Sequence, residues 1–179
     1  MSTQISRILA VEIRAARLGY AVLESTNRLG DFGAASFAIP SAARQRIARM
    51  LRLYRPSVLV LHGAGSRYPR DMRVRKSIAR IAKDEAKKAS VAMAVVPERG
   101  FKSFFHQFHC RDKYDIAATV AVRFPELAWR VPPPLDFYDP EPRQMLYFDS
   151  IALAIVYLES PEKANPNVAD DGVLSPASK

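Results

Sequence analysis

The stretch that decides the fold is residues 8–24, which read Ile-Leu-Ala-Val-Glu-Ile-Arg-Ala-Ala-Arg-Leu-Gly-Tyr-Ala-Val-Leu-Glu. The apolar run from Ile8 to Val11 ends at one acid, Glu12, and a second apolar run begins at Gly19 after the more polar residues 13–18. Two short β-prone segments around a tight connection predict a β-hairpin. Because burying an unpaired carboxylate is costly, we expect Glu12 either to have a cationic partner or to face a site.

Beyond the hairpin, segments with strand and helix periodicity alternate along the chain. A third strand is expected over 31–37, and a helix that starts at Pro40-Ser41 is expected to end before Pro56. The remaining expected segments are strands at 58–61 and 91–96 and helices at 71–89, 101–108, 112–124 and 145–159. Strands that alternate with helices indicate an α/β sandwich.

Length and composition fit one globular domain. A chain of 179 residues, 49% of them apolar, is large enough to bury a real core. We assign residues 1–159 to this domain and expect residues 160–179, rich in Pro, Ser, Asn and Asp, to be a disordered tail. We find no apolar run that could span a bilayer and no secretory signal. The single cysteine, Cys110, rules out an internal disulfide, and a cytoplasmic location is the default expectation.

The charge of the chain is strongly basic. Lys and Arg number 27 against 18 Asp and Glu, for a formal net charge of +9. The expected tail contributes −1 to that total, which leaves +10 on the folded part. Such a balance favours a polyanionic partner, either nucleic acid or an anionic membrane surface. The alternative is that the charge serves solubility alone.

Four phenylalanines recur at helical spacing. Phe101, Phe104, Phe105 and Phe108 occupy positions i, i+3, i+4 and i+7. This spacing favours a helix that buries an aromatic stripe. The alternative is an aromatic wedge against nucleic-acid bases, with Lys102 and Arg111 as basic neighbours.

The hairpin resembles the opening of the RuvC-like branch of the ribonuclease H superfamily, in which an apolar strand ends in Asp and Gly-Tyr follows seven residues later. Glu12, Gly19 and Tyr20 keep this spacing, with Glu in place of Asp. Three later segments also resemble this branch, in the same order: Lys113–Ala117, Pro125–Trp129 with the proline run after it, and Phe148–Ile155. The resemblance covers residues 8–159. It implies a ribonuclease H-like α/β fold, a five-stranded mixed sheet of three antiparallel and then parallel strands flanked by helices.

The resemblance also implies metal-dependent phosphodiester hydrolysis, in which carboxylates from two strands and the last helix hold two divalent ions. The matching catalytic positions here are Glu12, His62 and Asp149, and Leu146 stands where the resolvases have an additional acid. Glu12, Asp149 and Glu141 are the candidate metal ligands, with Mg or Mn as the cofactor if the protein is active and none otherwise. Imidazole is a poor magnesium ligand, and the acid set is depleted. We therefore interpret the catalytic site as eroded.

Two functional hypotheses follow. The first is a nucleic-acid-binding pseudo-enzyme that holds structured or double-stranded DNA, in preference to RNA, and has weakened or lost cleavage. Its expected phosphate contacts are Arg44, Arg49, Arg67, Arg70, Arg73, Arg75, Lys76 and Lys113. The alternative is an active Mg- or Mn-dependent endonuclease of the Holliday-junction resolvase type, with Lys113 steadying the scissile phosphate. A protein-interaction module is a third class, and the resemblance alone implies a homodimer.

Overall fold

The computed structural model describes residues 7–63, 69–135 and 140–160. Its elements in chain order are β1 (Ile8–Arg14), β2 (Arg17–Ser25), β3 (Arg28–Ser36), α1 (Pro40–Tyr54), β4 (Val58–Gly63), α2 (Pro69–Lys88), β5 (Ala92–Pro97), α3 (Glu98–His106), α4 (Lys113–Arg123), the 3-10 helix η1 (Pro125–Arg130) and α5 (Gln144–Glu159). Arg67, Asp139 and the expected tail beyond Ser160 lie outside the described residues. Within the described part, no helix is long and apolar enough to cross a membrane.

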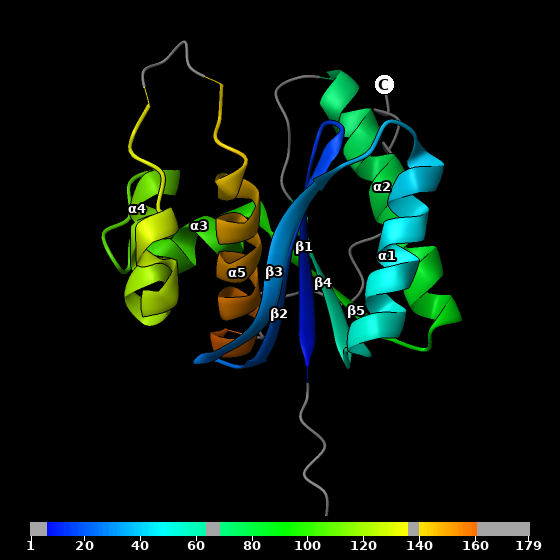
Figure 1. The fold of residues 1–179 in the computed structure, drawn as a ribbon, viewed down its shortest axis with the longest axis horizontal. Coiled ribbons are helices and arrows are strands. Elements are labelled where there is room, and N and C mark those ends of the chain that lie inside the picture. Colours follow the sequence, from blue (N-terminus) through cyan, green and yellow to red (C-terminus); the bar gives the residue numbers. More distant parts are fainter. Residues whose placement is uncertain (1–6, 64–68, 136–139, 161–179) are drawn as a thin grey trace, which may run out of the picture.

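The five strands form one mixed sheet in the order β3-β2-β1-β4-β5. β1, β2 and β3 pair antiparallel, whereas β4 pairs parallel with both β1 and β5. Helices α1 and α2 cover one face of the sheet, and α3, α4 and α5 lie on the other (Figure 1). The predicted α/β architecture, with three antiparallel strands followed by parallel ones, is confirmed.

The opening hairpin is longer than the sequence pattern predicted. β1 continues to Arg14 and β2 starts at Arg17, so the connection is only Ala15 and Ala16. Ala15 adopts a positive φ of 47°, a conformation for which Gly or Asn is the usual signal. Because neither residue is present at this turn, the pattern gave no indication of where the strands end. The prediction that residues 13–18 form the connection is therefore wrong.

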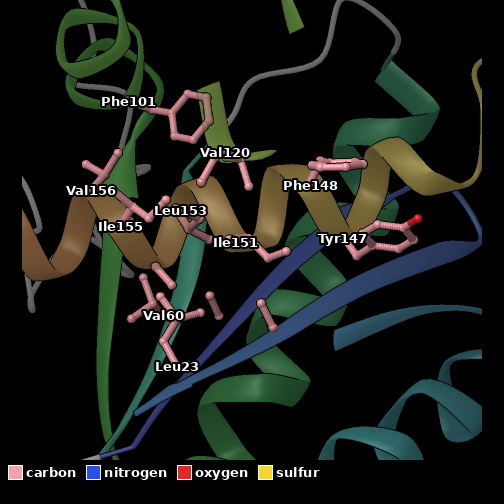
Figure 2. Close-up of a cluster of buried hydrophobic side chains, with 14 of the residues drawn as sticks. Leu23, Val60, Phe101, Val120, Tyr147, Phe148, Ile151, Leu153, Ile155 and Val156 are labelled. Atoms are coloured by element: carbon pink, nitrogen blue, oxygen red, sulfur yellow. The ribbon is translucent and has the colours of Figure 1, made fainter. Parts of the chain in front are cut away.

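Each face of the sheet buries its own apolar core. On the α5 face, one core cluster joins both sides of α5: Ile151 lies toward Leu23 and Val60 of the sheet, and Phe148 lies on the other side of the helix, with Val120 of α4 (Figure 2). Every residue of α5 from Met145 to Val156 is buried. A helix that is apolar on all sides is typical of one enclosed between layers, and here those layers are the sheet and the α3–α4 pair. Asp149 is thus carried on the most enclosed helix of the protein.

Gly19 is the point where α5 comes closest to the hairpin. It lies directly opposite Glu12 in the β1–β2 register. A Cβ added at Gly19 would lie 2.8 Å from the Leu146 Cβ and closer still to the Leu146 carbonyl. Only glycine leaves room for the helix backbone there. The Glu12–Gly19 spacing therefore brings the start of α5, with Asp149, beside the acid of β1.

Three local details differ from the sequence expectation. α3 begins at Glu98 and ends at His106, so the aromatic stripe is cut short: Phe101, Phe104 and Phe105 are buried, but Phe108 follows the helix and is 45% exposed. The segment Pro125–Arg130 forms a short 3-10 helix that no periodicity predicted. The third strand runs from Arg28 to Ser36, so it begins three residues before the predicted start.

Candidate functional site

The site is formed where β1, β4 and β5 end. Pairing between β1 and β4 stops at Val11–Leu61, so Glu12 and His62 are the first residues beyond the paired stretch on these two neighbouring strands. His62 Nδ1 is 2.7 Å from Glu12 Oε2. Its Nε2 is 3.1 Å from Oε2 of Glu98, the first residue of α3. The imidazole therefore lies between two carboxylates.

Arg14 is the centre of the acidic cluster. It stands two residues after Glu12 on β1 and so projects from the same face of the sheet. Its Nε is 3.6 Å from Glu12 Oε1, and its two terminal nitrogens donate to Glu141 Oε1 and Asp149 Oδ2. One guanidinium thus contacts three carboxylates that come from three separate segments.

Two more cations lie at the edge of this cluster. Arg75 of α2 places Nη2 3.6 Å from Glu12 Oε1, on the same oxygen that faces Arg14. Lys113, at the start of α4, donates from Nζ to Glu141 Oε1 at 2.6 Å. Each of the three carboxylates is therefore engaged by at least one basic side chain.

The backbone of β1 is fixed to α5 at the same place. The Glu12 N–H donates to the Ser150 hydroxyl at 3.3 Å, and that hydroxyl donates to the Leu146 carbonyl at 2.8 Å. Asp149 is only 4% exposed, so it is not an acid on the helix surface. Leu146, the residue in place of a further acid, is also buried and packs beside Gly19.

These contacts change the ionisation of the site. Burial alone would raise the pKa of Glu12, but His62, Arg14 and Arg75 together hold it below its usual value. Burial would lower the pKa of His62, yet the two flanking carboxylates raise it to about 9. Hydrogen bonding to His62 holds the pKa of Glu98 at about 2. Near neutral pH, His62 is therefore a cation between two anions.

Asp149 behaves differently from the other acids. Its burial raises its pKa to about 7, in spite of the opposing charge of Arg14, and the nearby Glu12 and Glu141 raise it further. Ionising Asp149 is therefore much less favourable than ionising a carboxyl in water. Glu141, by contrast, has a lowered pKa because Arg14 and Lys113 outweigh the effect of its burial.

A cleft of about 500 Å³ opens over this cluster. Residues of α3 and α4, including Phe101, Lys102 and Ile116, line it together with the strand ends. Its Lys and Arg side chains are Arg14, Arg75, Lys102, Arg111 and Lys113, and its acids are Glu12, Glu98, Asp112 and Asp149. Five Lys and Arg side chains against four acids make the lining positive. The cleft therefore suits an anionic ligand.

The residues do not fit the divalent metal ions that the fold family implies. Glu12, Glu141 and Asp149 do converge, but on the guanidinium of Arg14. The imidazole of His62 has Nδ1 2.7 Å from Glu12 Oε2 and Nε2 3.1 Å from Glu98 Oε2, so both ring nitrogens lie against carboxylates. Among the described residues, no group of three or more His, Cys, Asp and Glu side chains is arranged to hold a metal.

The expected phosphate contacts are spread over two regions. Arg70, Arg73 and Lys76 are exposed on the first half of α2, and Arg75, from the same turns, reaches into the cleft. Arg44 on α1 instead pairs with Glu85 of α2 at 2.5 Å, and Arg49 is exposed on α1. Neither α1 residue lines the cleft.

Two residues of the site were missed in the sequence. Arg14 was counted as part of the polar connection, although its i, i+2 relation to Glu12 is the signal that would have placed both on one face of a strand. Glu98 follows the last parallel strand directly, and His62 is the second-last residue of the parallel strand beside it. Residues at the carboxyl ends of neighbouring parallel strands meet at one edge of a sheet, and that rule would have found it.

The strand order and the position of the helix that carries Asp149 match the ribonuclease H-like fold that the sequence resemblance predicted. Among solved structures, the fold is similar to Thermus thermophilus RuvC in complex with a Holliday junction substrate, with a TM-score of 0.65, 14% identity and coverage of 85% of this chain and 92% of that chain. It is also similar to the yeast mitochondrial Holliday junction resolvase, with a TM-score of 0.62, 11% identity and coverage of 86% and 78%. No family model and no curated protein matches the sequence.

Proposed function

We propose that the protein binds structured or double-stranded DNA at the cleft and that metal-dependent cleavage is weakened or lost. The observation that carries the proposal is the guanidinium of Arg14, which lies among the three acids that would otherwise bind metal. A site built this way offers cations directly to a phosphate. Guanidinium groups bind phosphate oxygens through paired, charge-assisted hydrogen bonds.

The distribution of exposed cations supports a phosphodiester backbone as the ligand. Arg73 and Lys76 are exposed on α2, while Lys102 and Arg111 are exposed beside α3 and α4. Lys102 and Arg111 line the cleft, and Arg75 joins the α2 side to it. Cations on both sides of one cleft favour an extended polyanion over a single small anion.

The similar structures supply the DNA form to test first. One of them is a RuvC in complex with a Holliday junction substrate, and a four-way junction is therefore the first probe for this chain. From the family resemblance, we also propose that the protein prefers DNA to RNA and forms a homodimer.

The test is fluorescence anisotropy with a labelled four-way junction, a linear duplex and a single strand, each titrated at several salt concentrations. We expect binding of the junction and the duplex that weakens steeply with salt, because each neutralised phosphate releases a condensed counterion. Arg73→Ala combined with Lys76→Ala should lower the affinity and reduce the slope of log K against log salt by about 0.9 per lost phosphate contact. Absence of binding to all three probes at low salt would refute the proposal.

A matched control comes from α1. Arg46 and Arg52 are exposed on this helix, whose buried side packs into the core on the α1–α2 face of the sheet. Neither residue lines the cleft. Arg46→Ala combined with Arg52→Ala removes the same charge from the protein. If this control weakens binding as much as the α2 pair, net charge rather than the cleft accounts for affinity.

The alternative is an active Mg- or Mn-dependent endonuclease, which the convergence of Glu12, Glu141 and Asp149 favours. Labelled four-way junctions, flaps and RNA–DNA hybrids incubated with either metal discriminate between the two. Metal-dependent cleavage that is abolished by Asp149→Asn and by Glu12→Gln would establish the enzyme. Intact substrates in both metals would support the binding protein.

A further inference from the structure

We propose that the guanidinium of Arg14 is a resident cation that replaces a divalent metal ion, and that its removal opens a latent metal site formed by Glu12, Glu141 and Asp149. The inference concerns the same site as the proposed function. Its test uses no DNA, so that the two can fail separately.

The first step is the charge balance of the cluster. Three carboxylates brought together in a largely buried position need compensating positive charge to remain ionised. Arg14 faces all three, while Arg75 and Lys113 add a cation at Glu12 and at Glu141. These three basic side chains equal the acids in number, and His62 is a further partner of Glu12. A dication added to this arrangement would lie beside Arg14 and be repelled by it.

The second step is shape. The guanidinium is planar and donates through several N–H groups that point outward in a fixed fork. It therefore holds the carboxylates apart around its rim, with Glu12 on the Nε side and Glu141 and Asp149 at the two terminal nitrogens. A magnesium ion needs its oxygen ligands about 2.1 Å from one centre. The same three acids cannot surround the rim of a guanidinium and also converge on one metal ion. Arg14 and a metal ion therefore cannot occupy the site together.

The third step is that Arg14 is held in place. It is the last residue of β1, and its backbone pairs with Arg17 across the hairpin. The side chain is 25% exposed and three acids bind it, so moving it out would leave them uncompensated. Metal must therefore compete with a tethered cation, whose effective concentration is high because it belongs to the same chain.

The test measures binding of Mn²⁺ and Mg²⁺ by thermal unfolding and titration calorimetry, with wild type compared with Arg14→Gln and Arg14→His. The histidine variant leaves an imidazole, itself a transition-metal ligand, and it can still carry a proton, which protects the fold. Arg17→Gln removes a charge from the same hairpin, directly opposite Arg14 in the strand register, and is the matched control.

We expect 10 mM metal or excess chelator to leave the Tm of wild type and of Arg17→Gln unchanged. Mn²⁺ should raise the Tm of Arg14→Gln or Arg14→His by about 5 °C or more, the effect of a ligand at roughly 100 times its Kd on a domain of this size. Adding Asp149→Asn to either variant should abolish that gain, because one of the three ligands is lost.

The inference is overturned if wild type binds Mn²⁺ as tightly as the Arg14 variants, or if neither variant responds to metal. An Arg14→Gln protein that folds only with Mn²⁺ present would support it. The wild-type measurement needs no variant at all, so saturable binding of metal to the unaltered protein decides against the inference even if both substitutions prevent folding.

Discussion

The charge on His62 provides the sharpest test of the site's electrostatics. Its pKa is raised from the ordinary 6.5 to about 9, because the imidazolium lies between Glu12 and Glu98. At 1.36 kcal/mol for each pKa unit, the protonated form contributes about 3 kcal/mol to the free energy of unfolding. Since the folded-state pKa is the higher one, this contribution is complete below pH 6.5 and is lost as the pH rises through about 9.

The assay is urea unfolding of wild type and His62→Gln at intervals from pH 6 to 9.5. Near pH 6 the variant should be less stable than wild type by about 3 kcal/mol, and by pH 9.5 most of the difference attributable to the proton should be gone. Subtracting the two profiles removes contributions from other groups that titrate in both proteins. His106→Gln is the control, because His106 lines the same cleft but is exposed; its stability should follow wild type at every pH.

A difference between wild type and His62→Gln that stays constant from pH 6 to 9.5 would refute the reasoning. It would mean that the imidazole packs between the carboxylates without carrying charge. The chain has only three histidines, so an NMR titration of their ring protons gives the pKa of His62 directly. A value at or below 6.5 would lead to the same conclusion.

Three further outcomes follow from the packing and charges. Gly19→Ala should lower the free energy of unfolding by about 3 kcal/mol or more, because its Cβ would overlap the Leu146 backbone. Gly30→Ala is the control: its Cβ would meet its nearest atom at 3.4 Å, so the free energy of unfolding should change by no more than about 0.5 kcal/mol. Urea unfolding compares the two variants. Asp149→Asn should stabilise the protein above pH 7 by at most about 4 kcal/mol, because burial raises the pKa of Asp149 from 3.8 to about 7. The gain in stability should vanish below pH 4, where the carboxyl is protonated in both the folded and the unfolded state. Unchanged stability at pH 8 would contradict this. Arg44→Ala should cost about 0.5 to 1 kcal/mol through its half-exposed ion pair with α2 and leave DNA affinity, measured by anisotropy, unaltered.

The fold was predictable because its signals are local and periodic. The Glu12–Gly19 spacing was read as a family likeness, and the structure supplies its physical reason: the glycine lets α5 approach the hairpin opposite the acid. Apolar strands at 58–61 and 91–96 and the apolar helix that carries Asp149 were found by the same periodicity. These elements set which residues share one end of the sheet.

The chemistry of the site was only half predictable. Glu12, His62, Glu141 and Asp149 were named from the sequence, but the cation between the acids was not, because a turn without Gly or Asn hid the last two residues of β1. Glu141 reaches Arg14 from an irregular segment before α5. Irregular segments have no period, so their direction cannot be read from sequence. Whether the acids surround a metal or an arginine depends on the end of β1 and on this irregular segment, and the sequence pattern predicted neither.

The retained charges argue that the site still serves a ligand. A buried ion cluster is weak support for stability, since apolar residues of similar volume often stabilise a core as well or better. Glu12 and Asp149 lie at 1% and 4% exposure, and the raised pKa of Asp149 shows that its ionised form is unfavourable where it stands. A fold that needed only packing would be better served by Leu or Met at these positions. Here the acids instead hold Arg14, Arg75 and Lys113 in fixed positions around an open cleft. Cations that are pre-positioned in this way lose little conformational entropy when a phosphate binds.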